Sequence, residues 1–267
     1  MQIAGQSALI TGAARGIGRA TALDLAKAGA DIIGTDVDAD GLAETGCQVQ
    51  SLGRSFLSFV GDISTRKTVQ GLVEVAAQSE RGFAILINNA GVAPCGAFTG
   101  RSFEEWTKAI NINLLSLMHL TWLALPHLAT YPQAHIVNIA SVAGKFGGEG
   151  LTAYAASKHG VVGFSSSLRE ELADRRIGVS WICPSYVNTR IVEGIKRSFI
   201  TPIFEVEQVA HAIRKAILKN QAEIFVPRFM RLPVDILPAI FPNFSRKISK
   251  YTKAAQGWLH AEKRLNY

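Results

Sequence analysis

The chain has 267 residues, of which 48% are hydrophobic and 18% are charged. This composition allows a sizeable core and excludes a disordered chain. No run of eighteen apolar residues occurs, and the first twelve residues lack the basic flank and long apolar stretch of a signal peptide. We therefore expect neither a membrane-spanning helix nor a secretory leader.

Most of the positive charge lies in the tail. The net charge is +7, and residues 228–267 hold eight Lys or Arg against two acids, a net charge of +6. The rest of the chain is nearly neutral, which argues against a specific nucleic-acid-binding face in its body. An anionic surface, such as a membrane, is left as a partner for this tail.

Short β-rich runs alternate with helical patterns along the chain. The predicted strands are residues 7–11, 31–36, 55–60, 83–88, 135–140, 178–183 and 223–226. The predicted helices are residues 16–29, 39–51, 66–80, 104–129, 155–175 and 205–219. Several strands are continuously apolar, so the alternation predicts an α/β fold, a doubly wound parallel sheet with helices on both faces. We expect one domain over residues 1–227.

Residues 228–267 form an extension of a different character. Its first part carries prolines among large apolar residues and predicts neither a strand nor a long helix. Elsewhere, the three cysteines are odd in number and far apart, which indicates a reducing, cytoplasmic compartment rather than a disulfide framework. The six histidines show no paired ligand spacing, so we expect no metal site.

The segment LITGAARGIGRA, residues 9–20, combines a strand, a glycine turn and a helix start. Gly12, Gly16 and Gly18 follow the pattern G-x-x-x-G-x-G, with Ile17 between the last two. Glycine lets a phosphate approach the backbone closely, and a helix N-terminus offers N–H groups to a pyrophosphate. A glycine turn alone is a weak signal. Its place between the first strand and the first helix predicts a Rossmann-type dinucleotide site.

Two charged residues bear on the choice between NAD and NADP. Asp36 ends the second predicted strand, where a carboxylate can accept hydrogen bonds from the adenosine ribose and repel a 2′-phosphate. Arg15, in the glycine turn, favours NADP if it reaches a 2′-phosphate, and otherwise is a solvated loop cation. We predict NAD, because Asp36 acts at the discriminating position, and NADP is the alternative.

The segment TAYAASKHG, residues 152–160, places Tyr154 and Lys158 four residues apart. Such positions share one face of a helix, and a nearby positive charge favours the ionised form of a phenol. Tyr154 could then act as an acid or base near neutral pH. By itself the pair is a weak signal and is more typical of a partly buried tyrosine beside a lysine.

Together with the glycine turn, the segments NNAG at 88–91 and YAASK at 154–158 resemble the short-chain dehydrogenase/reductase family over about residues 5–226. The resemblance implies that Tyr154 is the general acid/base, and that Lys158 lowers its pKa and binds the nicotinamide ribose. Ser141 would hold the substrate oxygen. Asn113 matches the family asparagine that supports a water in a proton relay; an amide at a helix irregularity is a compatible reading.

The resemblance also implies contacts with the cofactor. Asp62 and Ile63 would flank the adenine, and Asn89, with Ala90 and Gly91, would border the adenosine. Val187 and Thr189 would bond the nicotinamide carboxamide.

One departure from the family pattern concerns this last segment. Ser185 stands where the family has glycine, which leaves the contacts of Pro184 and Tyr186 in question. Tyr186 is an alternative substrate-cleft residue.

The ending of the chain resembles family members that act on steroids, retinoids or other lipids. Its apolar side chains would roof the substrate cleft, pack a subunit interface, dip into a membrane surface or pack on their own domain. These side chains are Phe229, Met230, Leu232, Ile236, Leu237, Ile240 and Phe241. Residues 190–204, at the family's substrate loop, are also apolar. We therefore expect a small hydrophobic alcohol or ketone as substrate.

Other readings stay open. An NADP-dependent sugar or acyl-chain carbonyl reductase is the alternative enzyme, and a catalytically silent dinucleotide-sensing regulator is the alternative outside enzymology. The basic tail alone would give only weak, sequence-blind nucleic-acid binding. The resemblance further implies a homo-oligomer, a dimer or tetramer, packed through the helices at 104–129 and 155–175.

Overall fold

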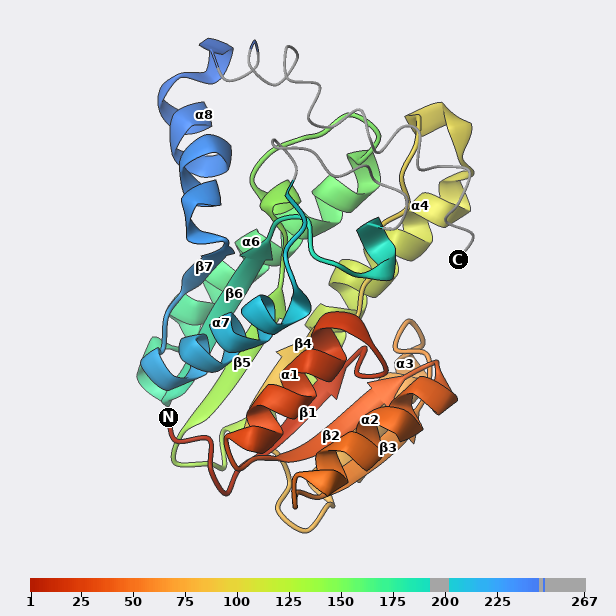
Figure 1. The fold of residues 1–267 in the computed structure, drawn as a ribbon, viewed down its shortest axis with the longest axis vertical. Helices are drawn as coiled ribbons and strands as arrows, with labels where there is room; N and C mark the ends of the chain where they lie inside the picture. Colours follow the sequence, from red (N-terminus) through yellow and green to blue (C-terminus); the bar gives the residue numbers. More distant parts are fainter. Residues whose placement is uncertain (193–201, 245–246, 248–267) are drawn as a thin grey trace.

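The computed structural model describes residues 1–192, 202–244 and 247. Seven parallel strands form one sheet in the order β3-β2-β1-β4-β5-β6-β7 (Figure 1). The strands are β1 (Ser7–Thr11), β2 (Asp31–Asp36), β3 (Phe56–Val60), β4 (Ile85–Asn88), β5 (Ala134–Ile139), β6 (Ile177–Pro184) and β7 (Glu223–Val226). All seven predicted strands are present, with ends moved by at most two residues, and the predicted doubly wound sheet is confirmed.

Helices cover both faces of this sheet. They are α1 (Gly16–Lys27), α2 (Ala39–Ser51), α3 (Arg66–Ala77), α4 (Phe103–Ile110), α5 (Ser116–Leu128), α6 (Thr152–Glu171) and α7 (Val206–Lys219). Successive strand residues point to opposite faces. Ile10 packs with Leu25 under α1, α2 and α7, whereas Leu9 packs with Leu120 under α3, α5 and α6. Two apolar layers therefore enclose the sheet, and helices lie on both of its faces (Figure 1).

The predicted helix 104–129 is interrupted, which the sequence did not indicate. A π-helical turn, Asn111–Leu115, separates α4 from α5. It turns Asn113 into the interior, where the side chain is 1% exposed. Ser116 Oγ donates to the Asn111 carbonyl oxygen at 2.7 Å, so one carbonyl disturbed by the wider turn keeps a partner.

By length and composition, the helical run Phe103–Leu128 is apolar enough to cross a membrane. Its Leu120, Ala124 and Leu128 are fully buried in the core layer beside the sheet. Such burial is what a core helix of a folded domain shows, so this run is part of the domain.

The helix that carries Tyr154 begins earlier than predicted. α6 starts at Thr152 rather than at residue 155. Tyr154 therefore lies in its first turn and Lys158 one turn further on. The predicted i, i+4 relation on one helix is confirmed, and it places both side chains at the end of α6 that faces the carboxyl edge of the sheet.

The described stretch after β7 contains no strand, in line with the prediction, and each of its helical elements is five residues long or shorter. A 3₁₀ turn (Arg228–Met230), a π-helical turn (Leu232–Ile236) and α8 (Leu237–Ile240) follow one another. Pro233 and Pro238 stand among the first two residues of their segments. Because these segments adjoin, both prolines lie inside one continuous helical run, and each removes a backbone donor from it.

This C-terminal helical segment, residues 228–244, is fixed to the domain on its inner side. Val234 is buried at 8% exposure, and Lys145 Nζ lies 3.5 Å from Asp235 Oδ1 and 2.8 Å from Glu223 Oε1. The one acidic side chain of the segment therefore points towards the protein.

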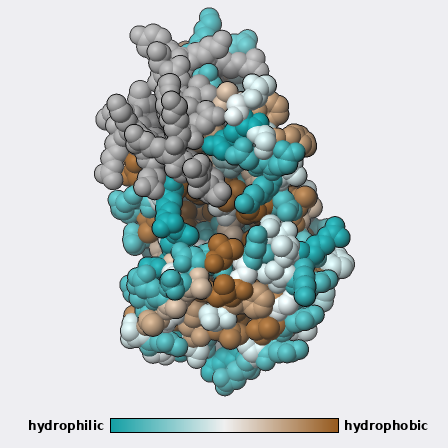
Figure 2. Space-filling view, turned by 90° about the vertical axis from the view of Figure 1, so that its right-hand side faces the viewer, coloured by the Kyte–Doolittle hydropathy of each residue, from teal (hydrophilic) through white to brown (hydrophobic). Residues whose placement is uncertain are grey.

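Many of the large apolar side chains on the surface concentrate in two segments. Around α4 and α5 they are Phe98, Phe103, Leu115, Met118 and Trp122; in residues 228–244 they are Phe229, Leu232, Ile236, Ile240, Phe241 and Phe244. Apolar groups also interrupt the mostly hydrophilic surface on the side that carries β3 (Figure 2). A large exposed apolar cluster usually marks a surface that contacts another protein, a ligand or a membrane.

Candidate active site

A cavity of about 690 Å³ opens at the carboxyl ends of the strands. The strand order reverses between β1 and β4, and open parallel sheets bind ligands at this point. Of the predicted site residues, all but three line this cavity. The three are Gly18, Asn113 and Tyr186. Their positions are described below.

The glycine turn has the backbone that its residues predict. Gly12 and Gly16 have φ values of +67° and +55°, which other residues rarely adopt. α1 follows directly, with no side chain capping its N-terminus and no acid in its first turn. The N-terminal N–H groups of α1 therefore suit an anion such as a pyrophosphate.

Gly18 serves packing rather than lining the cavity. A Cβ atom at this position would lie 1.9 Å from the Gly12 carbonyl oxygen. Only hydrogen fits between α1 and the turn that precedes it. The third glycine of the motif thus lets the helix approach the end of β1.

Asn89 ties the glycine turn to β4. Its Nδ2 donates to the carbonyl oxygens of Thr11 at 2.9 Å and Gly12 at 3.1 Å. In return, Thr11 Oγ1 accepts from the backbone N–H groups of Asn89 and Ala90, both at 3.0 Å. The NNAG segment thereby holds the shape of the turn while lining the same cavity.

Asp36 lies at the far end of the cavity, with its carboxylate held by the backbone. Oδ2 accepts from Ala14 N at 3.0 Å and Oδ1 accepts from Asp38 N at 3.1 Å. Each carboxylate oxygen accepts more than one hydrogen bond, so both keep capacity for a hydroxyl. This arrangement fits the two hydroxyls of a ribose.

Tyr154, Lys158 and Ser141 meet at the other end. Lys158 Nζ lies 5.8 Å from the centroid of the Tyr154 ring. Tyr154 is 9% exposed, Ser141 8% and Lys158 4%, yet all three line the cavity. Ser141 Oγ accepts from Ala143 N at 3.1 Å, which leaves its own hydrogen for another acceptor.

Lys158 is a buried amine with a lowered pKa. Its Nζ donates to the Ile139 carbonyl oxygen at 2.7 Å. Burial lowers the pKa of Lys158 from 10.5 to about 8, and the nearby Cys183 opposes this slightly. The amine is still mostly protonated at neutral pH, so a positive charge stands beside the Tyr154 ring.

Asn113 sits behind the cavity wall. Its Oδ1 accepts from Val92 N at 2.8 Å, and its Nδ2 donates to Val92 O at 2.9 Å and to Ser157 Oγ at 3.0 Å. Ser157 Oγ in turn donates to the Tyr154 carbonyl oxygen at 2.7 Å. Asn113 therefore joins the loop after β4 to the first turn of α6. Asn111 donates instead to Ser64 O at 3.2 Å, away from Tyr154.

The surroundings of Tyr154 are apolar. It packs in a cluster with Ala93, Cys95, Ala143 and Leu151, against which Tyr186, Ile191 and Ile203 lie. Tyr186 thus packs against the cluster that contains Tyr154, although it is outside the lining of the cavity. The predicted loop 190–204 lies partly outside the described residues, which end at 192 and resume at 202.

Ser185 and Thr189 sit on an ordered part of the chain. Ser185 N donates to Val226 O at 2.8 Å, so pairing with β7 continues past the end of β6. Thr189 Oγ1 donates to Val187 O at 3.2 Å, and both residues line the cavity. Serine in place of the family glycine is accommodated here.

Ten residues outside the predicted set of site residues line the cavity, although three of the ten are Ser185 and two members of the predicted loop 190–204. They are Thr35, Val37, Gly61, Val92, Ile112, Ile139, Ala140, Ser185, Arg190 and Ile191. Most of them stand one or two positions from a predicted residue, at or just after the end of a strand. A search of the residues around each predicted strand end could therefore have found them. Ile112 comes from the π-helical turn and had no such signal.

The residues present fit a dinucleotide along this cavity. Two glycines in left-handed conformation shape the turn, and a buried donor, Arg15 Nη1, has no hydrogen-bond partner among the described residues. No group of three His, Cys, Asp or Glu side chains that could hold a metal is found in the described part of the chain.

A family model described as short chain dehydrogenase matches residues 6–198. The chain belongs to this family. Estradiol 17-beta-dehydrogenase 11 of Rattus norvegicus is 32% identical over 244 residues, which cover 90% of this chain and 81% of that protein. Ketoacyl reductase HetN of Nostoc sp. is 34% identical over 231 residues, 84% of this chain and 79% of that protein.

Among solved structures, carveol dehydrogenase from Mycobacterium avium, in complex with NAD, has a TM-score of 0.79. It is 24% identical and covers 84% of this chain and 97% of its own, which shows the fold. Family membership confirms the predicted resemblance and makes the protein an NAD(P)-dependent oxidoreductase that interconverts an alcohol and a carbonyl.

Proposed function

We propose that the enzyme oxidises a hydrophobic alcohol, or reduces the matching ketone or aldehyde, with Tyr154 as the acid/base and NAD as the cofactor. The observation that carries this proposal is the position of Tyr154. It stands at the wall of the dinucleotide cavity, beside the buried Lys158 amine, and in an otherwise apolar cluster.

The bound nicotinamide supplies the hydride chemistry, and the chain supplies position and charge. In oxidation, the Tyr154 phenolate takes the proton of the substrate hydroxyl as a hydride leaves the carbinol carbon. In reduction, the phenol returns that proton to the substrate oxygen. The protonated Lys158 amine stabilises the phenolate, because the two groups are buried together. Ser141 donates its hydroxyl hydrogen to the substrate oxygen.

Asn113 supports this arrangement from behind. Both Nδ2 hydrogens already donate, to Val92 O and Ser157 Oγ, and Oδ1 accepts from Val92 N. One acceptor position on Oδ1 is left for a water in a proton relay. We therefore propose that its first task is to fix the loop after β4 against α6.

A hydrophobic substrate is supported by the cluster around Tyr154 and by the names of two relatives. One relative is named for estradiol and another for ketoacyl substrates. A sugar, by contrast, would leave hydroxyls unpaired against Ala93, Leu151 and Ile203. An NADP-dependent acyl-chain reductase is the alternative that these relatives favour.

The test is a screen of NAD and NADP with steroid, retinoid and aliphatic alcohols, and with the matching carbonyls. The absorbance of the reduced nicotinamide is followed. We expect turnover with NAD and at least one apolar alcohol. Turnover restricted to NADP and polar carbonyls would contradict both preferences, and dinucleotide binding without any turnover would favour the regulator.

We also propose that the enzyme is a homo-oligomer, a dimer or tetramer. Leu115, Met118 and Trp122 of the α5 region are exposed, Trp122 by 68%, although the helix is otherwise part of the core. A second copy of the same helix could cover this face. A sedimentation-velocity experiment at micromolar concentration that finds only monomer would contradict this.

We propose that the enzyme is cytoplasmic and that residues 228–244 contact an anionic membrane surface. The segment turns Asp235 towards Lys145 and exposes Phe229 by 62%, Ile240 by 61% and Phe244 by 58%. Its outer face is thus the apolar one. Residues 228–267 add a net charge of +6, which attracts anionic lipids.

Vesicle co-sedimentation tests this contact. We expect binding to vesicles with phosphatidylserine, reduced by salt, little binding to neutral phosphatidylcholine, and loss of binding in Ile240→Asp. Equal behaviour of wild type and Ile240→Asp on both vesicles would refute the contact. Conversion of an oligomer to a monomer by Ile240→Asp would assign this face to subunit packing instead.

A further inference from the structure

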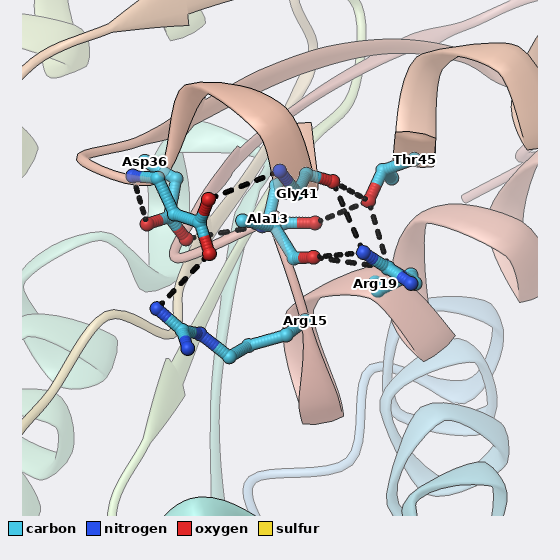
Figure 3. A network of polar contacts seen from close by, with 8 residues as sticks. Ala13, Arg15, Arg19, Asp36, Gly41 and Thr45 are labelled. Atoms are coloured by element: carbon cyan, nitrogen blue, oxygen red, sulfur yellow. Dashed lines mark hydrogen bonds and ion pairs between the residues drawn. The ribbon is translucent and has the colours of Figure 1, made fainter. Parts of the chain in front are cut away.

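Asp38 forms an ion pair at the adenosine end of the cavity that sequence reasoning did not anticipate. Arg15 Nη2 lies 3.2 Å from Asp38 Oδ2 (Figure 3). Arg15 lines the cavity, whereas Asp38 is outside its lining. The Arg15 guanidinium at the cavity wall is therefore held by a carboxylate that lies outside the cavity lining.

The backbone fixes the position of the Asp38 carboxylate. Asp38 is the N-cap of α2, and its Oδ1 accepts from Gly41 N at 3.0 Å. Its own N–H donates to Asp36 Oδ1 at 3.1 Å. Oδ1 is used by the cap, and Oδ2 is the oxygen that pairs with Arg15.

Arg15 is incompletely satisfied in this position. Its Nη1 is buried and finds no hydrogen-bond partner in residues 1–192 or 202–244. A buried donor without a partner is unfavourable, so a ligand acceptor at this point would be favoured. The donor belongs to a residue that lines the dinucleotide cavity, which makes the cofactor the natural source of that acceptor.

Three of the charged groups at this end, Arg15, Asp36 and Asp38, are linked to one another and do not cancel; Asp62 lines the same cavity. Arg15 carries one positive charge against the negative charges of Asp36 and Asp38, so the set is net negative. Without Asp38 it would be neutral. The 2′-phosphate that distinguishes NADP carries between one and two negative charges near neutral pH. Asp38 therefore makes this end less favourable for NADP.

We propose that Asp38 determines cofactor specificity by holding Arg15 and cancelling its charge. The guanidinium is then a donor for the neutral ribose of NAD rather than a partner for a 2′-phosphate. This inference rests on the proposed preference for NAD and extends it to a residue behind the cavity wall. Asp38 is a positioning residue, since it acts through Arg15.

Asp38→Ser is the informative variant. Serine is a strong N-cap, so the start of α2 keeps its side-chain acceptor, but serine is too short to reach the Arg15 guanidinium. Glu44→Gln is the matched charge control. Glu44 pairs with Arg19 at 2.8 Å in the neighbouring part of the network, and its side chain is 58% exposed.

The experiment measures dissociation constants of NAD and NADP by calorimetry. The proteins are wild type, Asp38→Ser, Arg15→Ala, the double variant and Glu44→Gln. In Asp38→Ser we expect NADP affinity to rise by about tenfold, a change of roughly 1.4 kcal/mol. NAD affinity should change by less than about twofold, as expected for a weak, half-exposed ion pair. Glu44→Gln should leave the ratio of the two affinities unchanged.

The double variant decides whether Asp38 acts through Arg15. With Arg15 replaced by alanine, the Asp38 substitution should no longer raise NADP affinity. An equal rise in that background would show a bare charge effect and overturn the inference, as would no change in Asp38→Ser itself. Steady-state kinetics should place the change in KM for NADP rather than in kcat.

Failure of the proposed cofactor preference would be visible separately. A wild-type enzyme that binds NADP more tightly than NAD would refute that preference. The NADP affinities of wild type, Asp38→Ser, Arg15→Ala and the double variant would still decide the role of Asp38. Binding of neither dinucleotide by any of the proteins would overturn both proposals.

Discussion

The two ends of the cavity are built on opposite principles. At the adenosine end, Arg15, Asp36 and Asp38 are partly exposed and are connected to one another and to backbone N–H groups. At the reaction end, Tyr154 and Lys158 are nearly inaccessible and lie among apolar side chains.

The difference follows from the task of each end. Charges at half-exposed positions interact weakly, which is enough to distinguish two cofactors that differ by a phosphate. A buried charge interacts strongly, because little water screens it, and chemistry on a substrate oxygen needs this strength. Substitutions at the reaction end should therefore change rates far more than substitutions at the adenosine end change affinities.

The strongest test of this contrast is Tyr154→Phe. Loss of the hydroxyl removes the acid/base, so we expect kcat to fall by about 10²–10⁴-fold. The affinity for reduced NAD should stay within about twofold, because the ring and its packing remain. Stopped-flow kinetics and fluorescence titration measure the two quantities.

A matched control is Tyr131→Phe. The Tyr131 hydroxyl donates to the Arg81 carbonyl oxygen at 2.6 Å. Neither residue lines the cavity. Its kcat should equal that of wild type. If Tyr154→Phe keeps more than about a tenth of the wild-type turnover, Tyr154 is not the acid/base, and the contrast between the two ends of the cavity is wrong.

The adenosine end is tested by Gly18→Ala. The added Cβ would lie 1.9 Å from Gly12 O, a backbone atom that cannot turn aside. We expect the free energy of unfolding to fall by about 1–3 kcal/mol, with a loss of dinucleotide affinity, because α1 must move away from the turn. Urea denaturation and calorimetry measure these changes.

Gly71→Ala is the control for this substitution. A Cβ at Gly71, within α3, would meet Phe59 at 3.7 Å, an ordinary contact. Alanine is also the better helix former, so the free energy of unfolding should rise by about 0.5–1 kcal/mol. If both variants lose the same stability, close packing of α1 on the turn is not what Gly18 provides.

Both ends of the cavity were predictable from sequence where local backbone rules set the residue type. Gly12 and Gly16 stand where positive φ is required, and Tyr154 and Lys158 share a helix face in any register. The strands were found because continuously apolar runs are typical of a covered parallel sheet.

What the sequence did not reveal depends on contacts between distant segments. The π-helical turn that buries Asn113 exists beside Val92, twenty-one residues earlier, and nothing in the letters of 104–129 marks it. The Arg15–Asp38 pair likewise joins the glycine turn to the start of α2. The prolines of the stretch after β7 predicted no long helix, and Pro233 and Pro238 stand in short helical segments that adjoin one another.

The smallest effect that we predict concerns the charge of Lys158. Burial lowers the pKa of Lys158 to about 8, so its proton is lost as the pH rises through 8 rather than through the usual 10.5. An ammonium holds a ribose hydroxyl more strongly than a neutral amine does. The affinity for reduced NAD should therefore fall by up to about tenfold between pH 7 and pH 9.5, or roughly 1.4 kcal/mol.

The titration is made in Tyr154→Phe enzyme, in which no phenol at position 154 contributes. Adding Lys158→Met to this background should remove the pH dependence and lower the affinity at pH 7. Lys145→Met should keep it, because Glu223 and Asp235 beside Lys145 raise the pKa of that amine against the effect of burial. If the affinity for reduced NAD still changes with pH in the Lys158→Met variant, the titrating group is another residue. The prediction that the charge of Lys158 contributes to binding would then be wrong.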